Sequence, residues 1–204
     1  MPFSLNEKIV IASNNKKKIA ELSAILTKLG LTAVPQSELG IDLIPEEDGL
    51  TFMDNARIKA RAVYDACRLP TIADDSGLVV YALNGEPGVH SARYGGEGLD
   101  DGGRTCLLLK NMESVPDDNR GAAFVSAVCL VLDAAHTVEG EGRIEGEILR
   151  EQRGDGGFGY DPVFYLPAYE QTFAELPADV KNTISHRAHA LAAFEKNLKK
   201  ERQQ

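Results

Sequence analysis

Residues 71–80, TIADDSGLVV, bring an apolar run up to two adjacent carboxylates, Asp74 and Asp75. The residues before Asp74 predict a buried strand, and the apolar run after Gly77 predicts a second one. Proteins of the α/β class bind ligands where strands end, and paired acids there are costly unless a cation or a proton shares them. We therefore expect one aspartate to bind Mg²⁺ and the same residue or its neighbour to orient and deprotonate a water molecule. The structural alternative is an aspartate turn that caps the strand.

Helices alternate with strands early in the chain, and strands dominate the middle. Apolar residues recur at helical spacing up to Gly30, a typical helix stop, and again after Thr51, a suitable N-cap. This order predicts an α/β fold with a mixed, twisted sheet flanked by helices and a cleft between two lobes. The expected strands are 8–12, 31–34, 71–74, 78–83, 122–132 and 143–149, with a turn and a short strand between the last two. The expected helices cover 19–29, 51–67 and the end of the chain from about 185. Residues 154–164 are expected to form a glycine-rich loop that leads into a short strand.

The composition is that of a globular protein of 204 residues, which we expect to form a single domain of two lobes over residues 1–204. Apolar residues make up 43% and charged residues 26%, which excludes disorder as the main state. No window approaches the roughly 18 apolar residues of a membrane span, and no signal peptide is evident, so we expect a cytoplasmic protein with no membrane partner. The net charge of −9 argues against a nucleic-acid partner. The three scattered cysteines predict neither disulfides nor a zinc site.

A polar loop, SNNKKK at residues 13–18, separates the first predicted strand from the first predicted helix. Such a loop directs backbone N–H groups and the positive end of a helix toward a ligand, which suits phosphate. The lysines add positive charge, although a solvent-exposed first turn is the simpler explanation of a lysine cluster. The candidate phosphate-binding residues are Ser13, Asn14, Asn15, Lys16, Lys17 and Lys18.

Acidic residues precede the second helix in the stretch PEEDGLTF, residues 45–52. They favour the helix dipole, and a metal site is the functional alternative. Mg²⁺ is typically held by one or two carboxylates together with water and phosphate oxygens. One carboxylate among Glu46, Glu47 and Asp48 would then act with one at residues 74–75. Lys59, further along the helix, is either a phosphate contact or a surface lysine.

The loop GGFGYDP, residues 156–162, is the most specific local signal. Glycines on both sides of Phe158 free its ring to stack on a flat heterocycle. A tight turn that carries two aromatic residues is the alternative. Further on, Lys181 precedes the pair His186 and Arg187 at the predicted start of the last helix. Two adjacent donors there could bind the exocyclic oxygen of a purine, whereas a single histidine at a helix start is usually structural.

Six blocks occur in the order and at about the spacing of one family: SNNKKK, EEDGLTFMDNARIKA, IADDSGL, GEPGVHSARYGG, GGFGYDPVF and ISHRAHAL. From Lys8 to about Leu191 the chain resembles the inosine/xanthosine triphosphate pyrophosphatases. These enzymes hydrolyse non-standard purine nucleoside triphosphates to the monophosphate and pyrophosphate. The resemblance implies an elongated two-lobed α/β structure with a central cleft, Mg²⁺ as the cofactor, a homodimer, and ITP, dITP and XTP as substrates that are removed from the nucleotide pool.

The resemblance also implies roles for individual residues. Asp75 matches the catalytic acid, which accepts a proton and binds the metal with Glu47, and Glu46 is the close alternative to Glu47. Asn14 replaces a glycine of the family's first motif, and asparagine is the next best residue for positive φ. The residues that match substrate-binding positions are Ser13, Asn15, Lys18, Lys59 and Ser76 for phosphates and sugar, and Phe158, Gly159, Tyr160, Asp161, Lys181, His186 and Arg187 for the base.

These roles imply attack of water on the α-phosphorus and selection at the purine 6-position. A 6-keto oxygen can accept hydrogen bonds from His186 and Arg187. The 6-amino group of adenine is itself a donor and cannot accept from them. One alternative is a phosphatase or pyrophosphatase for standard or pyrimidine nucleotides with the same metal site. The other is a regulatory nucleotide-binding module without turnover.

Overall fold

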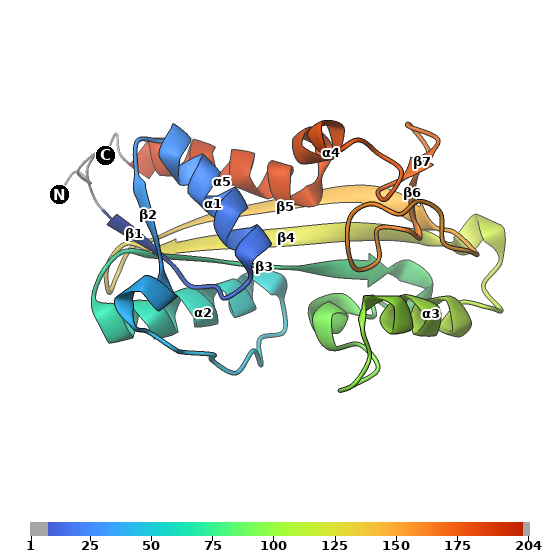
Figure 1. Cartoon of the computed structure of the whole chain (residues 1–204), viewed down its shortest axis with the longest axis horizontal. Coiled ribbons are helices and arrows are strands. Elements are labelled where there is room, and N and C mark those ends of the chain that lie inside the picture. Colours follow the sequence, from blue (N-terminus) through green and yellow to red (C-terminus); the bar gives the residue numbers. More distant parts are fainter. Residues whose placement is uncertain (1–7, 202–204) are drawn as a thin grey trace. The chain divides into compact units, whose positions relative to one another are not determined.

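The computed structural model describes residues 8–201 as an α/β structure built on a seven-stranded mixed sheet (Figure 1). The strand order is β2-β1-β3-β4-β5-β6-β7; β1 is parallel to β2 and β3, and β6 is antiparallel to β5 and β7. The strands are β1 (Lys8–Ile11), β2 (Thr32–Pro35), β3 (Thr71–Val80), β4 (Gly121–Val131), β5 (Thr137–Ile148), β6 (Phe164–Leu166) and β7 (Gln171–Thr172). The helices are α1 (Lys16–Lys28), α2 (Phe52–Cys67), α3 (Asp101–Asn111), α4 (Ala178–Ile184) and α5 (His186–Glu201). The predicted α/β class and mixed sheet are confirmed.

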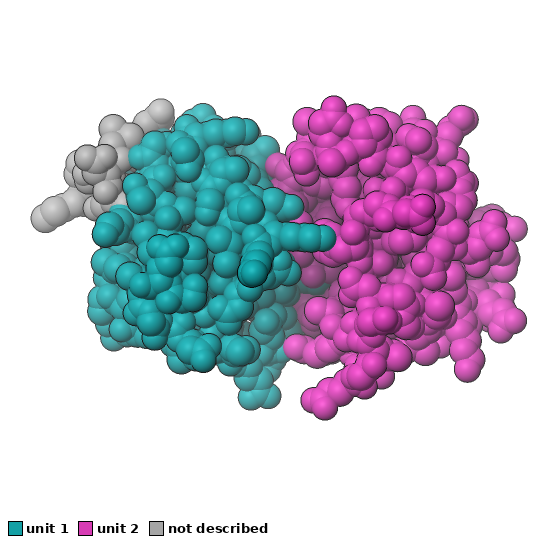
Figure 2. Space-filling view, viewed as in Figure 1, with its two compact units in different colours: residues 1–75, 126–142, 190–204 teal, residues 76–125, 143–189 magenta. Residues whose placement is uncertain are grey.

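The chain divides into two compact units, which Figure 2 distinguishes by colour. Unit 1 comprises residues 1–75, 126–142 and 190–204, and unit 2 comprises residues 76–125 and 143–189. Strands β3, β4 and β5 and helix α5 each contribute residues to both units. The single two-lobed domain with a central cleft stays a prediction.

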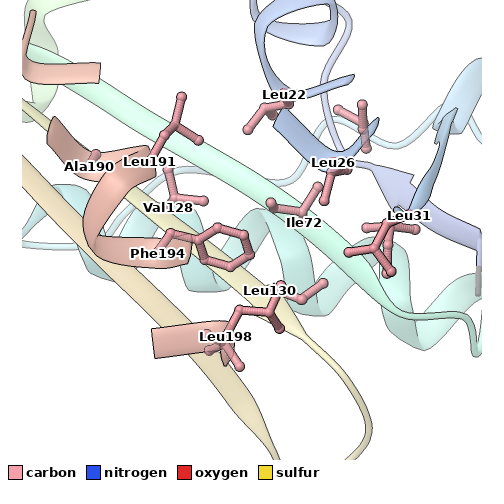
Figure 3. Close-up of a cluster of buried hydrophobic side chains, with 13 residues drawn as sticks. Leu22, Leu26, Leu31, Ile72, Val128, Leu130, Ala190, Leu191, Phe194 and Leu198 are labelled. Carbon is pink, nitrogen blue, oxygen red and sulfur yellow. The ribbon is translucent and has the colours of Figure 1, made fainter. Parts of the chain in front are cut away.

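Helices α1 and α5 pack on one face of the sheet in unit 1, and α2 lies on the other face (Figure 1). Figure 3 shows Leu22 and Leu26 of α1 and Phe194 of α5 packed around Ile72 of β3. The alternation of side chains along β3 then assigns Ile72 and every second residue to the α1 and α5 face. The buried members of this cluster are Ile9, Ile11, Leu22, Leu26, Leu31, Ile72, Val128, Leu130, Val138, Ala190, Leu191, Phe194 and Leu198.

The ends of the first two helices agree with the sequence-based predictions. Gly30, at φ 73°, follows the end of α1 in the left-handed conformation that glycine adopts readily. Thr51 caps α2: its hydroxyl accepts from the Asp54 N–H at 3.1 Å, and the Asp54 carboxylate accepts from the Thr51 N–H at 3.1 Å. This reciprocal capping box fixes the first turn of α2.

Among residues 8–201, no helix is both long and apolar enough to cross a membrane.

Two predicted breaks in strands are wrong. Strand β3 continues through Asp74, Asp75 and Gly77 to Val80, and residues 81–83 are a short 3-10 helix rather than strand. Strand β5 is likewise continuous over residues 137–148. The glycines of β5 mark close approaches instead of turns: a Cβ at Gly140 would overlap the backbone of Phe194 in α5. Helices α3 and α4 were not predicted.

Candidate functional site

Asp74 and Asp75 point to opposite faces of the sheet because successive side chains of a strand alternate. Asp74 lies on the same face as Ile72, and its Oδ2 is 3.0 Å from Nζ of Lys18 in α1. Asp75 faces α2, where Nζ of Lys59 is 2.8 Å from its Oδ1. Both aspartates are buried. Each carboxylate therefore has its own ammonium partner, and β3 accommodates two adjacent acids without a turn.

The ammonium group of Lys59 connects Asp75 to Glu47. Its Nζ lies 3.0 Å from Oε2 of Glu47, while the neighbouring Glu46 is exposed. Burial raises the pKa of Asp75 above its ordinary value, and the charge of Lys59 offsets part of this rise. Burial alone would lower the pKa of Lys59, but the carboxylates of Asp75 and Glu47 outweigh it, so the Lys59 pKa is raised. The result is a partly buried cation held between two carboxylates.

These two carboxylates fit a magnesium ion. They come from different parts of unit 1, converge on one positive charge, and supply the oxygen ligands that Mg²⁺ takes together with water. In the described part of the chain, no group of three or more His, Cys, Asp or Glu side chains forms a metal site. Two carboxylates would leave most ligand positions of a bound cation to water and substrate oxygens, as is usual for Mg²⁺ in phosphoryl-transfer sites.

The loop before α1 has a structural role as well as a candidate binding role. Oδ1 of Asn15 caps α1 and accepts from the N–H groups of Lys17 at 2.9 Å and Lys18 at 3.3 Å. The hydroxyl of Ser13 accepts from the Asn15 N–H at 3.2 Å. Lys16 and Lys17 are exposed, whereas Lys18 is half-buried and contacts Asp74 of β3. The six residues of the SNNKKK loop thus do not form one uniform phosphate site.

Asn14 occupies the position where the resemblance implies a glycine. It is not among the described residues with positive φ, so a side chain at this position causes no backbone strain. Its Oδ1 is 3.4 Å from Nε2 of Gln36, which also donates to the carbonyl of Leu43 at 3.0 Å. The exchange of glycine for asparagine is therefore compatible with the loop conformation.

A second cluster, in unit 2, surrounds the ring of Phe158, which is 43% exposed. Nζ of Lys181 lies 5.2 Å from the ring centroid, and Cζ of Arg187 lies 5.7 Å from it. The carboxylate of Asp161 accepts from the Phe158 N–H at 2.8 Å and also from Lys181. A Cβ at Gly157 would collide with this carboxylate, which explains the glycine. The loop is thus shaped around Asp161 and presents an aromatic ring next to two cations.

The histidine and tyrosine of the predicted base site are buried. The ring of His186 stacks on Phe124, with centroids 4.9 Å apart and planes 15° apart, and lies 6.5 Å from Phe173. Tyr160 lies in the core of unit 2, and its hydroxyl donates to the carbonyl of Ser91 at 2.9 Å. Packing therefore fixes the orientation of His186, and the environment of Tyr160 is that of a supporting residue.

Ser76 and Arg187 meet within unit 2. Nη2 of Arg187 is 3.5 Å from Oγ of Ser76, the residue that follows Asp75 in β3. Ser185 caps α5, since its Oγ accepts from the Ala188 N–H at 3.2 Å. This cap confirms the predicted helix start and holds the two residues that follow it in the first turn.

Three residues that contact the candidate sites were not identified from the sequence. Asn55 donates through Nδ2 to Oδ2 of Asp75 at 3.3 Å. Asp101 and Thr105 of α3 hold Gly159: Oδ2 of Asp101 accepts from the Gly159 N–H at 3.0 Å, and Oγ1 of Thr105 is 3.3 Å from the Gly159 carbonyl. Asn55 could have been found, because it precedes Lys59 by one helical turn and shares its face. Asp101 and Thr105 are far from Gly159 in the sequence, so no local pattern indicated that they contact it.

The fold and the two clusters define an α/β protein with a candidate cation and phosphate site in unit 1 and an aromatic, cationic site in unit 2. A sequence model of the Ham1 family matches residues 9–197. The chain belongs to the Ham1 family.

Individual relatives agree with this assignment and with the resemblance based on the six sequence blocks. The dITP/XTP pyrophosphatase of Haemophilus ducreyi is 47% identical over 193 residues, which cover 94% of this chain and 98% of that protein. The dITP/XTP pyrophosphatase of Mycobacterium tuberculosis is 48% identical, with 93% and 94% covered. The solved structure of the Ham1 protein from Staphylococcus aureus has a TM-score of 0.88 at 40% identity and covers 96% of this chain and 100% of that one. The Ham1 protein from Coxiella burnetii has a TM-score of 0.89 at 42% identity, with 95% and 99% covered.

Proposed function

We propose that this chain hydrolyses ITP, dITP and XTP to the monophosphate and pyrophosphate and so removes them from the nucleotide pool. The observation that carries the proposal is the convergence of Glu47 and Asp75 on one positive charge. The high identity to proteins named dITP/XTP pyrophosphatase over nearly the whole chain supports it. The homodimer, the cytoplasmic location and the lack of membrane or nucleic-acid partners stay predictions.

The chemistry of the proposal takes place at Asp75. Mg²⁺, when bound by Glu47 and Asp75, would neutralise charge on the phosphates. The carboxylate of Asp75 accepts a proton from the attacking water, whose oxygen forms the new bond to the α-phosphorus as the bond to the pyrophosphate oxygen breaks. Lys18 and Lys59 would stabilise the negative charge of the triphosphate and of the departing pyrophosphate.

The base would be bound by the cluster around Phe158. An exposed ring offers a stacking surface, and Lys181, His186 and Arg187 supply donors for a 6-keto oxygen. Consecutive residues of β3 connect the two sets, because Asp75 belongs to the phosphate-binding residues and Ser76 contacts Arg187.

Product analysis tests this function. We expect purified protein with Mg²⁺ to convert ITP, dITP and XTP to the monophosphate and pyrophosphate far faster than ATP, GTP or CTP. Release of orthophosphate would instead indicate attack on the terminal phosphate and a phosphatase. Equal rates with ATP and CTP would remove the base selectivity, and binding without any turnover would favour a regulatory nucleotide-binding module. Removal of Mg²⁺ by a chelator should stop turnover.

Replacing Phe158 by alanine should raise KM for every purine substrate and leave the preference among purines nearly unchanged. Loss of stacking costs roughly 1–3 kcal/mol, which corresponds to an increase of about 5- to 150-fold in KM if KM follows binding. Steady-state kinetics with ITP and XTP measure this effect. Tyr169→Ala is a matched control, because Tyr169 has the same 43% exposure and lies outside both clusters. Equal KM values for Phe158→Ala and the wild type would contradict stacking.

A further inference from the structure

The side-chain amide of Asn55 connects the two segments that carry Glu47 and Asp75. Asn55 is fully buried on α2, with an exposed fraction of 0%. Its Nδ2 donates to Oδ2 of Asp75 at 3.3 Å, and its Oδ1 accepts from the N–H of Gly49 at 2.9 Å. One side chain therefore bonds at its two ends to β3 and to the loop before α2.

The hydrogen bond from Asn55 to Asp75 restricts the orientation of the Asp75 carboxylate. Oδ2 is engaged by the Asn55 amide, and Oδ1 by contrast faces Lys59, the cation that also contacts Glu47. Rotation of the carboxylate would break both contacts, because each oxygen has a donor of its own. Asn55 thus helps to direct Oδ1 toward the position where the two acidic residues converge.

The bond to Gly49 determines where the acidic loop lies. Gly49 follows Glu47 by two residues, so an anchor at its N–H restricts the position of the Glu47 backbone. The approach is very close: a Cβ at Gly49 would lie 2.6 Å from Oδ1 of Asn55 and 2.9 Å from its backbone nitrogen. Only glycine allows this contact without movement of the loop.

Asn55 itself is held rigidly by the start of α2. Its N–H donates to the carbonyl of Thr51 at 3.1 Å, inside the turn that the capping box of Thr51 and Asp54 closes. A group that orients metal ligands is effective when its own position is fixed by packing and hydrogen bonds. The first turn of α2 meets this condition.

We propose that Asn55 is a positioning residue that sets Glu47 and Asp75 in place for a divalent cation before the nucleotide arrives. This inference rests on the proposed function, since it assigns the cation to these two carboxylates. A purely structural role, in which Asn55 only satisfies buried polar groups, is the competing explanation. The two differ in one property, which is the affinity of the folded, nucleotide-free protein for the cation.

Asn55→Leu tests the inference, because leucine has the same branching and number of side-chain heavy atoms but no polar atoms. We expect Mn²⁺, used alone as the probe in isothermal titration calorimetry, to bind roughly 10- to 100-fold more weakly than to the wild type, the range found when groups that orient metal ligands are removed. Circular dichroism and thermal melting establish that the compared proteins are folded. At saturating Mg²⁺, kcat for ITP should fall, and KM should change little because phosphate and base contacts remain.

Gly49→Ala provides a second variant in case Asn55→Leu does not fold. It keeps Asn55 and its bond to Asp75 but displaces the loop that carries Glu47, and we again expect weaker Mn²⁺ binding. Asn197→Ala is the matched control: it removes an amide that donates to the carbonyl of Glu139 in the same unit, and its Mn²⁺ affinity should equal that of the wild type.

The outcomes separate this inference from the proposed function. Wild-type affinity for Mn²⁺ in a folded Asn55→Leu or Gly49→Ala protein would overturn the inference. Absence of Mn²⁺ binding to the nucleotide-free wild type would also overturn it, because the site would not be preformed, although release of pyrophosphate from ITP would still support the proposed function. Conversely, weaker Mn²⁺ binding by the variants together with no pyrophosphate release by the wild type would support the inference and refute the function.

Discussion

Asp75→Asn should lower kcat for ITP by roughly 10³-fold or more, because the proposed function makes Asp75 both the proton acceptor and a metal ligand. The neutral amide cannot accept a proton at neutral pH. It also places an NH₂ group against a donor in either orientation, since Lys59 and Asn55 both donate to Asp75. Substrate affinity should change less, because Lys18 and the residues around Phe158 are retained.

Single-turnover and steady-state kinetics, with pyrophosphate as the measured product, check this expectation. The matched control is Asp74→Asn, which changes the neighbouring carboxylate on the opposite face of β3. In that variant we expect a higher KM, because Lys18 loses its ion-pair partner, and a kcat within about tenfold of the wild type. A nearly normal kcat for Asp75→Asn, or an equal loss of kcat in both variants, would contradict the catalytic role proposed for Asp75.

The Asp75→Asn protein should remain folded. A neutral amide of the same size relieves the cost of burying a charged carboxylate, which offsets part of the unfavourable contact between its NH₂ group and Lys59 or Asn55. Lys59 keeps Glu47 as a partner. Thermal melting therefore separates loss of catalysis from loss of structure, and a large fall in melting temperature would mean that the kinetic comparison has to be repeated with the conservative Asp75→Glu.

Local patterns predicted the parts of the fold that depend on neighbouring residues. Thr51 and Gly30 were recognised as helix ends because capping and left-handed conformations involve only a few adjacent residues. The continuity of β3 was not predicted, because Asp74 and Asp75 are stable within a strand only when Lys18 and Lys59 arrive from two helices. A strand that depends on partners far along the chain cannot be identified from its own sequence.

The same distinction applies to the candidate sites. Glu47 and Asp75 were predicted to share a metal ion and Lys59 to contact phosphate, and in the structure Lys59 contacts both carboxylates. The groups that hold them were missed, because a buried amide such as Asn55 has no characteristic sequence pattern. Asp101 and Thr105 contact Gly159 from a helix that was not predicted at all. Sequence motifs thus identified candidate binding residues, whereas the residues that position them required the structure.

His186 is the residue at which base selectivity should be most sensitive. Its ring is stacked on Phe124, and the residue is only 7% exposed. This close packing leaves the ring little freedom to move. In the proposed function His186 is a fixed donor at the purine 6-position, where it favours a keto oxygen over an amino group. Such matched polar contacts discriminate much more strongly than shape alone. His186→Ala should therefore lower the ratio of kcat/KM for ITP to that for ATP by roughly 10²-fold, part of the range that polar recognition achieves.

Two further variants separate the donor from the packing. His186→Phe keeps an aromatic ring against Phe124 but has no donor, so it should lose selectivity while it retains more stability than His186→Ala. His189→Ala removes an exposed histidine of the same helix, whose Nδ1 is 2.9 Å from the carbonyl of Arg143, and should leave the ratio unchanged. If His186→Phe keeps the wild-type ratio, the base is recognised without this donor, and Arg187 and Lys181 become the residues to test. If His186→Phe and His186→Ala lose the ratio equally while their stabilities differ, the hydrogen bond rather than the packing is the source of selectivity.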